Sequence, residues 1–363
     1  MADWLSSMEQ SFEYYIVDPN TWKDDKIITN IKSSTINRDS TVETLGSAII
    51  DITESVGECY IRIYLVTIQN GVKEKHPLGT FLVQTPSSSF DGKIREVSMD
   101  AYTPLLEIKE KQLPLGYYVE KNANILEKAH LILTTNMSDG TDEGLRNLRA
   151  PVIETKSDVK LVSDFVADPE DSILVFVTDL IQNAKYKLAL DELGRVLFAP
   201  DQKIDSLQPV WTYDDNNSSI LYPDLTMDHD LYGIPNVVEV IYSNGSNRYY
   251  KRVENKDENS PTSIPRRGRE IIHRVTNPGF TGIPSEKEVE EYANTLLSEL
   301  STVEYTISYT HGYCPVRLGD CIRLNYTRAG LTNIKAKVIS QSIKCEPGCP
   351  VTEKAVFTKK LWR

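Results

Sequence analysis

Four of the five cysteines in this chain have the spacing C-x6-C-x23-C-x3-C and are Cys314, Cys321, Cys345 and Cys349. Each pair brackets a turn that contains proline and glycine. Because neighbouring hairpin ends can bring four thiolates to one centre, this pattern predicts a zinc ion or an iron–sulfur cluster. Two other interpretations stay open: four unrelated buried thiols, or two disulfides with three possible connectivities. With no signal peptide and an isolated fifth cysteine, Cys59, we expect a cytosolic setting in which disulfides are disfavoured.

Other residues with chemical potential do not form a catalytic pattern. The sequence contains no G-x-S-x-G elbow, no phosphate-binding P-loop and no H-E-x-x-H helix. His229 has a carboxylate on either side, but we interpret Asp228-His229-Asp230 as a solvated turn in an acidic linker. The acidic run could supply two glycosidase carboxylates, although nothing fixes their spacing; its members are Asp214, Asp215, Asp224 and Asp228. We therefore predict that the chain is not an enzyme.

The cysteines follow an amphipathic helix and lie in a series of strands. Ser285 and Glu288 form a capping box, and apolar residues then recur at helical spacing as far as Leu300. After the helix, four β-rich segments are separated by turns with Gly or Pro: Val303 to Thr310, Asp320 to Tyr326, Asn333 to Lys344 and Glu353 to Thr358.

The rest of the chain is also rich in predicted strands. Alternating apolar residues predict strands near 48–52, 59–65, 78–84 and 94–99, with Asn70-Gly71 as a hairpin turn. Helices are expected near 104–111, 122–136 and 171–184, although Ile173 to Val177 could also be a buried strand. A tight hairpin follows, built on the segment Leu190-Asp191-Glu192-Leu193-Gly194-Arg195-Val196-Leu197-Phe198. We interpret 205–233 as a linker, and a second hairpin begins at Asn236.

Length and charge set broad limits. The 363 residues suggest about two to three domains, which we place at 1–118 (N-terminal barrel), 119–234 (mixed helix and hairpin) and 235–363 (second barrel with the helix and cysteines). The fold class is α+β and β-rich, and no stretch is apolar enough for a membrane span.

The net charge of −12 argues against tight binding of nucleic acid and suits a protein that lets DNA pass. A local basic group, Arg266, Arg267 and Arg269, is interpreted as a loop or subunit contact.

The order of these elements resembles the baseplate hub family of phage tails and related contractile injection machines. The match covers essentially the whole chain and includes the hairpin at Leu190 to Phe198, the helix at Ser285 to Leu300, and Val316-Arg317-Leu318-Gly319-Asp320-Cys321-Ile322. The resemblance implies a homotrimer with two tube-like antiparallel β-barrels per subunit, which joins the tail tube protein to a central spike protein and lines the channel. Tape-measure and baseplate wedge proteins would be further neighbours. It also implies a virion location in the tail baseplate after assembly in the host cytoplasm.

The resemblance bears on the cysteines as well. Tail-tip proteins of some long-tailed phages, similar to these hubs, carry a C-terminal iron–sulfur cluster on four cysteines. Cys314, Cys321, Cys345 and Cys349 look like that set, which implies a cluster of the four-iron type, with zinc as the alternative. Two other functions remain open: a carbohydrate-binding tail adhesin, suggested by 19 tyrosines and four tryptophans, and a tail-associated glycan hydrolase.

Overall fold

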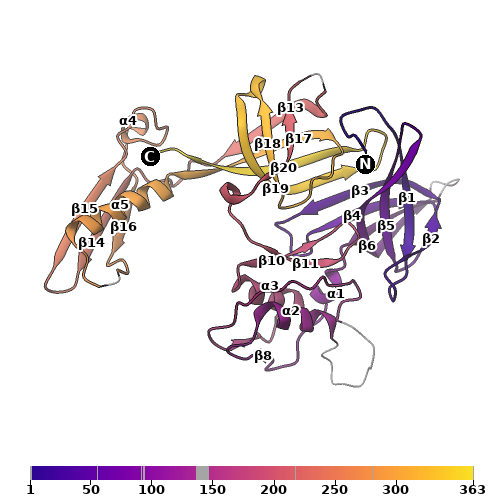
Figure 1. Cartoon of the computed structure of the whole chain (residues 1–363), viewed down its shortest axis with the longest axis horizontal. Helices are drawn as coiled ribbons and strands as arrows, with labels where there is room; N and C mark the ends of the chain where they lie inside the picture. Colours follow the sequence, from indigo (N-terminus) through magenta and orange to yellow (C-terminus); the bar gives the residue numbers. More distant parts are fainter. Residues whose placement is uncertain are drawn as a thin grey trace. The chain divides into compact units, whose positions relative to one another are not determined.

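The computed structural model describes residues 2–54, 56–90, 92, 95–135, 147–216, 218–280 and 282–362. The chain forms two compact units (Figure 1). The large unit consists of Met1–Asp224 and Tyr309–Lys354, and the small unit consists of Leu225–Ser308 and Ala355–Arg363. The chain thus leaves the large unit, builds most of the small unit and returns. Among the described residues, no helix is both long and apolar enough to span a membrane.

One 13-stranded sheet contains most of the strands of the large unit. Its order is β13-β17-β20-β19-β3-β4-β7-β6-β5-β1-β2, with β18 beside β19 and β12 beside β18. The first seven strands are β1 (Glu9–Val17), β2 (Asp24–Ile28), β3 (Ile31–Asp39), β4 (Gly46–Ile52), β5 (Tyr60–Gln69), β6 (Val72–Phe90) and β7 (Arg95–Tyr102). The later strands are β12 (Pro209–Asp214), β13 (Leu221–His229), β17 (Thr302–Gly312), β18 (Cys321–Tyr326), β19 (Leu331–Lys344) and β20 (Pro350–Lys360).

The two halves of this sheet meet where β19 pairs with β3. The pairing is antiparallel, with Ile343 opposite Ile36, and both side chains are buried. The β-rich α+β class is therefore confirmed. The prediction of two separate β-barrels is wrong for the described residues. Their strands form one hydrogen-bonded sheet that runs from β13 to β2 and does not close on itself. Sequence patterns reveal strands but not partners 300 positions apart, so this pairing was missed.

A helical layer with its own core lies between β7 and β12 in the chain. Asn124 caps α2 by accepting from the backbone N–H of Glu127, and Ser172 caps α3 by accepting from that of Val175. Such caps satisfy N–H groups that have no partner within the helix. The predicted helices and the tight hairpin are confirmed, with the bounds α1 (Leu106–Lys109), β8 (Tyr118–Val119), α2 (Ile125–Thr134), β9 (Phe165–Val166), α3 (Ile173–Gln182), β10 (Tyr186–Leu190) and β11 (Val196–Pro200).

The turn of the β10–β11 hairpin is fastened to the N-terminal strands of the large unit. The carbonyl oxygen of Leu193 accepts hydrogen bonds from Trp22 Nε1 at 2.8 Å and from Arg62 Nη2 at 3.2 Å. Gly194 has φ +74°, and a Cβ there would lie 2.7 Å from Thr80 Cβ. Two separate reasons therefore require glycine at position 194: its left-handed backbone angle and the close approach of Thr80.

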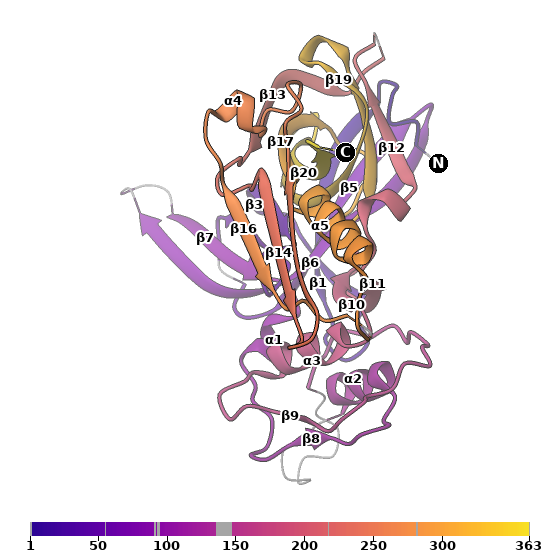
Figure 2. The ribbon, with the colours of Figure 1, turned by 90° about the vertical axis from the view of Figure 1, so that its left-hand side faces the viewer.

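The small unit is a three-stranded sheet with one helix on one face. Its sheet order is β15-β14-β16, and α5 packs against β14 and β15 (Figures 1 and 2). The capping box of Ser285 and Glu288 is confirmed. On the other face, Glu239 pairs with Arg252 at 2.9 Å and Arg274 at 2.6 Å from the flanking strands. The bounds are β14 (Val237–Ser243), β15 (Arg248–Glu254), α4 (Ile264–Arg267), β16 (Ile272–Thr276) and α5 (Glu286–Leu300).

The structure also changes the organisation expected for 205–233 and beyond. The predicted linker is wrong, because this segment contains a 3₁₀ turn (Ile204–Ser206) and the strands β12 and β13. β12 runs parallel to β18, so its partner comes from far along the chain. A second 3₁₀ turn, Thr327–Ala329, precedes β19. The two units divide the chain differently from the predicted domains 1–118, 119–234 and 235–363, since 309–354 lies with the N-terminal strands.

Candidate functional site

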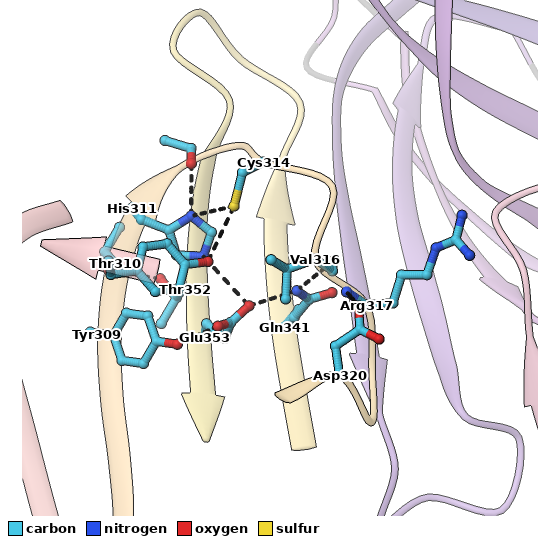
Figure 3. A network of polar contacts seen from close by, with 12 residues as sticks. Tyr309, Thr310, His311, Cys314, Val316, Arg317, Asp320, Gln341, Thr352 and Glu353 are labelled. Atoms are coloured by element: carbon cyan, nitrogen blue, oxygen red, sulfur yellow. Dashed lines mark hydrogen bonds and ion pairs between the residues drawn. The ribbon is translucent and has the colours of Figure 1, made fainter. Parts of the chain in front are cut away.

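A buried polar cluster lies between β12, β17, β19 and β20 of the large unit (Figure 3). At its centre, His311 Nε2 is 3.5 Å from Glu353 Oε2, and both side chains are fully buried. Tyr309 donates its hydroxyl proton to Glu353 Oε1, and Gln341 Nε2 donates to Glu353 Oε2 at 2.7 Å. The carboxylate therefore has three partners from two other strands.

The histidine side of the cluster is equally well occupied. His311 Nδ1 donates to the carbonyl oxygen of Gly312 at 2.7 Å, while Nε2 is 3.1 Å from the hydroxyl of Tyr213. That hydroxyl is in turn 3.2 Å from Cys314 Sγ. Burial by itself lowers the pKa of His311, but hydrogen bonds with Cys314 and Glu353 and the charge of Glu353 raise it to about 10. The imidazole is therefore protonated at neutral pH and pairs with the carboxylate.

This arrangement can hold strands together but offers no access to a substrate. His311, Glu353 and Cys314 are at most 2% exposed. A buried ion pair is tolerated only when further hydrogen bonds compensate for the lost hydration, as they do here. The chemistry of the cluster is therefore structural. It fixes the register of four strands whose partners are distant in sequence.

The four predicted ligand cysteines are distributed over three places. Cys314 belongs to the cluster around Tyr213 and His311. Cys321 begins β18 and directs its Sγ toward the carbonyl oxygen of Ile322 at 3.7 Å. Cys345 and Cys349 flank a turn and pack against the core of the N-terminal strands. The structure thus brings together the last pair only.

These thiols do not fit a four-ligand centre as they are arranged here. Burial raises the pKa of Cys345 to about 11 and that of Cys349 still further. Within the described ranges, no group of three or more His, Cys, Asp or Glu side chains is placed to hold a metal ion. The iron–sulfur or zinc site stays a prediction that elemental analysis tests.

The other candidate residues also have structural surroundings. His229 belongs to β13 and stacks on Tyr305 with ring centroids 4.5 Å apart. Asp214 accepts a hydrogen bond from Asn325, and Asp215 accepts one from Thr327. Arg267 of the basic group donates to the carbonyl oxygens of Ile234 and Leu231, both at 2.7 Å. Asp214, Asp215 and Arg267 therefore make contacts that join neighbouring segments of the fold.

Sequence reasoning missed the polar cluster, although the signal was present. β17 buries every second residue from Val303 to His311, so two tyrosines, Tyr305 and Tyr309, and one histidine occupy inward positions. Glu353 likewise lies between the buried residues Val351 and Ala355 in β20. A charged residue at an inward strand position requires a buried partner. Extending the alternation of Val303 to Thr310 by one residue and then searching for inward polar residues would have indicated this pair.

Comparison with solved structures identifies the fold. A tail protein from Neisseria meningitidis MC58 superposes with a TM-score of 0.59 over 96% of this chain and 96% of that chain, at 9% identity. The 43 kDa tail protein of prophage MuSo2 from Shewanella oneidensis gives 0.57 over 96% of this chain and 98% of its own, at 10% identity. A chain of the Francisella PdpA–VgrG complex gives 0.53 at 10% identity, over 96% of this chain and 58% of that one.

No protein-family model matches the sequence, and no curated protein matches it either. At such low identities the likeness concerns the fold. The chain has the fold of these phage tail proteins over nearly its whole length. The resemblance read from the order of its elements is confirmed at that level.

Proposed function

We propose that this chain is a structural hub of a phage tail or related injection machine. In this proposal three copies form a ring that joins the tail tube to a central spike and lines the channel. The observation that carries it is the shared fold over 96% of this chain and at least 96% of two tail proteins. A match over whole chains favours the same structural task more strongly than a match of one domain, although a fold alone does not fix a function.

Two features of the chain support an assembled state. The sheet ends at β2 and β13, and open sheet edges are normally covered by another chain or element. Ile27 on β2 is 46% exposed in the single chain. An apolar side chain at this edge would be buried if another subunit covered it. The buried position of the His311–Glu353 pair supports a role without catalysis.

The proposed partners follow from this position in a tail. They are two further copies of the chain, the tail tube protein and the spike, with tape-measure and wedge proteins as neighbours. One of the similar structures is a complex that includes VgrG. The net charge of −12 suits a ring through which DNA passes without binding. The location would be the tail baseplate of the virion, after assembly in the host cytoplasm.

Native mass spectrometry over a range of concentrations, with and without the tube and spike proteins, tests this proposal. We expect a trimer alone or with a partner, and threefold averages in electron micrographs. A chain that stays monomeric under all these conditions would overturn the hub. The same preparation should give no hits on a glycan array and no degradation of peptidoglycan; clear hits or turnover would favour the adhesin or the hydrolase instead.

A further inference from the structure

The large unit contains a cleft of about 460 Å³ that the buried cluster does not use. Its walls come from α3, from β10 and its turn, from the β3–β4 connection, from β6, and from the loop that precedes β18. Binding pockets for compact groups have volumes of about 300–1,000 Å³. Apolar side chains dominate the lining, among them Val42, Leu45, Leu78, Phe81, Leu174 and Leu318. The cleft can therefore receive a large apolar side chain.

The carboxylates around the cleft are already paired or exposed at its rim. Glu192 pairs with Arg317 at 2.5 Å, and Asp191 pairs with Arg195 at 2.6 Å. Glu43 pairs with Lys109 at 2.8 Å. Asp179 lies on the exposed side of α3. Glu192 thus neutralises Arg317, which also lines the cleft, but none of these carboxylates forms an ion pair with Lys187.

Lys187 is the cation that lacks such a partner. It is half-buried on β10, and its Nζ lies 3.4 Å from the position of a Cβ built on Gly319, another lining residue. In the part of the chain that the structure describes, no carboxylate forms an ion pair with it. The nearby Asp201 is 3.5 Å from Lys337 instead. Burial and then the charge of Lys337 lower the pKa of Lys187, and the charge of Asp201 offsets part of this fall. A carboxylate placed against Lys187 would stabilise its charged form further.

Arg38 forms a fixed part of the cleft wall. Its Nη2 donates to the carbonyl oxygen of Leu78 at 2.6 Å, and its Nη1 donates to Gln341 Oε1 at 3.0 Å. Gln341 in turn holds Glu353. Both Nη atoms of Arg38 are therefore engaged in hydrogen bonds. Lys187 remains as the group that can form an ion pair with an incoming carboxylate.

We propose that this cleft binds a segment of a partner tail protein in which a large aromatic or aliphatic side chain is followed by a carboxylate. The apolar side chain fills the cleft, and the carboxylate pairs with Lys187. A polar rim that includes Asp179 and Gln182 of α3 surrounds the cleft, and a buried anchor with a polar rim is the usual anatomy of such contacts. The choice of a protein segment rests on the proposed function, in which the chain works among other tail proteins.

Three labelled hexapeptides test the proposal with the full-length chain. They are acetyl-Gly-Ser-Phe-Glu-Ser-Gly-amide, the same peptide with Phe-Gln, and the same peptide with Ser-Glu at the centre. Fluorescence anisotropy should give the tightest binding for Phe-Glu, by about tenfold over each of the others, which corresponds to about 1.4 kcal/mol. Equal binding of all three peptides, or binding of none, would overturn the proposal.

Matched variants locate the contact. Lys187→Met should lower the affinity for the Phe-Glu peptide to that of the Phe-Gln peptide, while Lys203→Met, an exposed lysine outside the cleft, should change nothing. If Lys187→Met does not fold, Val175→Glu replaces it, because a carboxylate on the α3 wall should repel the same peptide. Unchanged binding in either folded variant overturns the assignment. Ring formation is measured separately, so a ring that binds no peptide would overturn the cleft and leave the hub intact.

Discussion

The indole nitrogen of Trp22 donates a hydrogen bond to the carbonyl oxygen of Leu193, which lies 171 positions later in the chain. Trp22 has φ 57°, in the left-handed region that bulky residues rarely occupy. Its ring also packs edge-on against the ring of Tyr60, with the ring centroids 4.8 Å apart. This contact fastens the β10–β11 hairpin to the N-terminal strands. It also fixes one wall of the cleft that contains Lys187.

Replacing Gly194 tests that attachment. Gly194→Ala combines a left-handed backbone with a methyl group 2.7 Å from Thr80 Cβ. The backbone term costs about 1–2 kcal/mol, and overpacking adds about 1–3 kcal/mol. We expect the free energy of unfolding of the large unit to fall by roughly 2–5 kcal/mol, measured by denaturant titration.

Gly116→Ala is the matched control. Gly116 has φ +76°, and nothing lies within 4 Å of a Cβ built there. This variant has the unfavourable left-handed backbone but no steric clash, so its free energy of unfolding should fall by about 1–2 kcal/mol. If both variants lose the same stability, the close packing of Gly194 on Thr80 contributes nothing.

The buried His311–Glu353 pair predicts a dependence of stability on pH. The pKa of His311 is about 10 in the folded chain and 6.5 as its ordinary value. A raised histidine pKa stabilises the fold fully below pH 6.5, and this contribution is lost as the pH rises toward 10. Between pH 7 and 8.5 we expect the free energy of unfolding to fall by up to about 1.4 kcal/mol per pH unit.

His311→Gln separates this effect from other titrations. The variant should be less stable at pH 7 but should lose most of the slope between pH 7 and 8.5. His76, whose pKa is lowered by burial, acts below this window with the opposite sign. The raised pKa of Cys345 adds to the fall only near and above pH 9. An unchanged slope in His311→Gln would show that another group titrates.

The capping box of α5 gives a local prediction for the small unit. Ser285 Oγ accepts from the backbone N–H of Glu288 at 3.3 Å. Ser285→Ala should cost about 1 kcal/mol and speed hydrogen exchange in the first turn. Ser285→Thr keeps a hydroxyl that can accept from Glu288 N–H and donate to the Glu288 carboxylate, and it should stay close to the original. Equal exchange in both variants would contradict a role for this cap.

Elemental analysis of anaerobically purified protein decides the question of the cysteines. The predicted iron–sulfur cluster or zinc ion requires Cys314, Cys321 and the pair Cys345–Cys349 to come together, whereas their thiols lie in separate places in this structure. Absence of stoichiometric iron and zinc would overturn the prediction. A brown protein with broad visible absorption, or one zinc per chain, would contradict this arrangement. In that case Cys345→Ser should abolish the metal while Cys59→Ser, the matched control, should retain it.

Local chemistry made several elements predictable. The capping box at Ser285 and the turn at Gly194 are read from neighbouring residues, because a cap or a tight turn is decided within a few positions. The β-strands near Ile50 and Ile61 follow from alternation. The order of these elements carried the resemblance, and the fold that the chain shares with solved tail proteins confirms it at the level of the fold.

Partners far apart in the sequence were not predictable in the same way. The segment around Trp211 and Tyr213 was interpreted as a linker because its apolar residues are interrupted by acidic ones; its partner is β18, more than 100 positions later. Glu353 begins the predicted strand Glu353 to Thr358, and His311 lies one residue beyond the predicted strand Val303 to Thr310, which the structure extends to Gly312. Inward polar residues were not paired across these strands. The cysteine spacing suggested a common centre, whereas strand pairing places Cys314 and Cys349 among different neighbours.

Because the chain returns from the small unit to the large one, β3 is synthesised long before its partner β19. Asn37 on β3 and Ser342 on β19 are hydrogen-bonded across 305 positions. At about 5–20 residues per second, a ribosome needs roughly 15–60 s to make the second after the first. During that interval one edge of β3 has no partner, while the segment 225–308 emerges as a nearly continuous folding unit. A nascent chain in this state is the form most open to pairing with a strand of another copy.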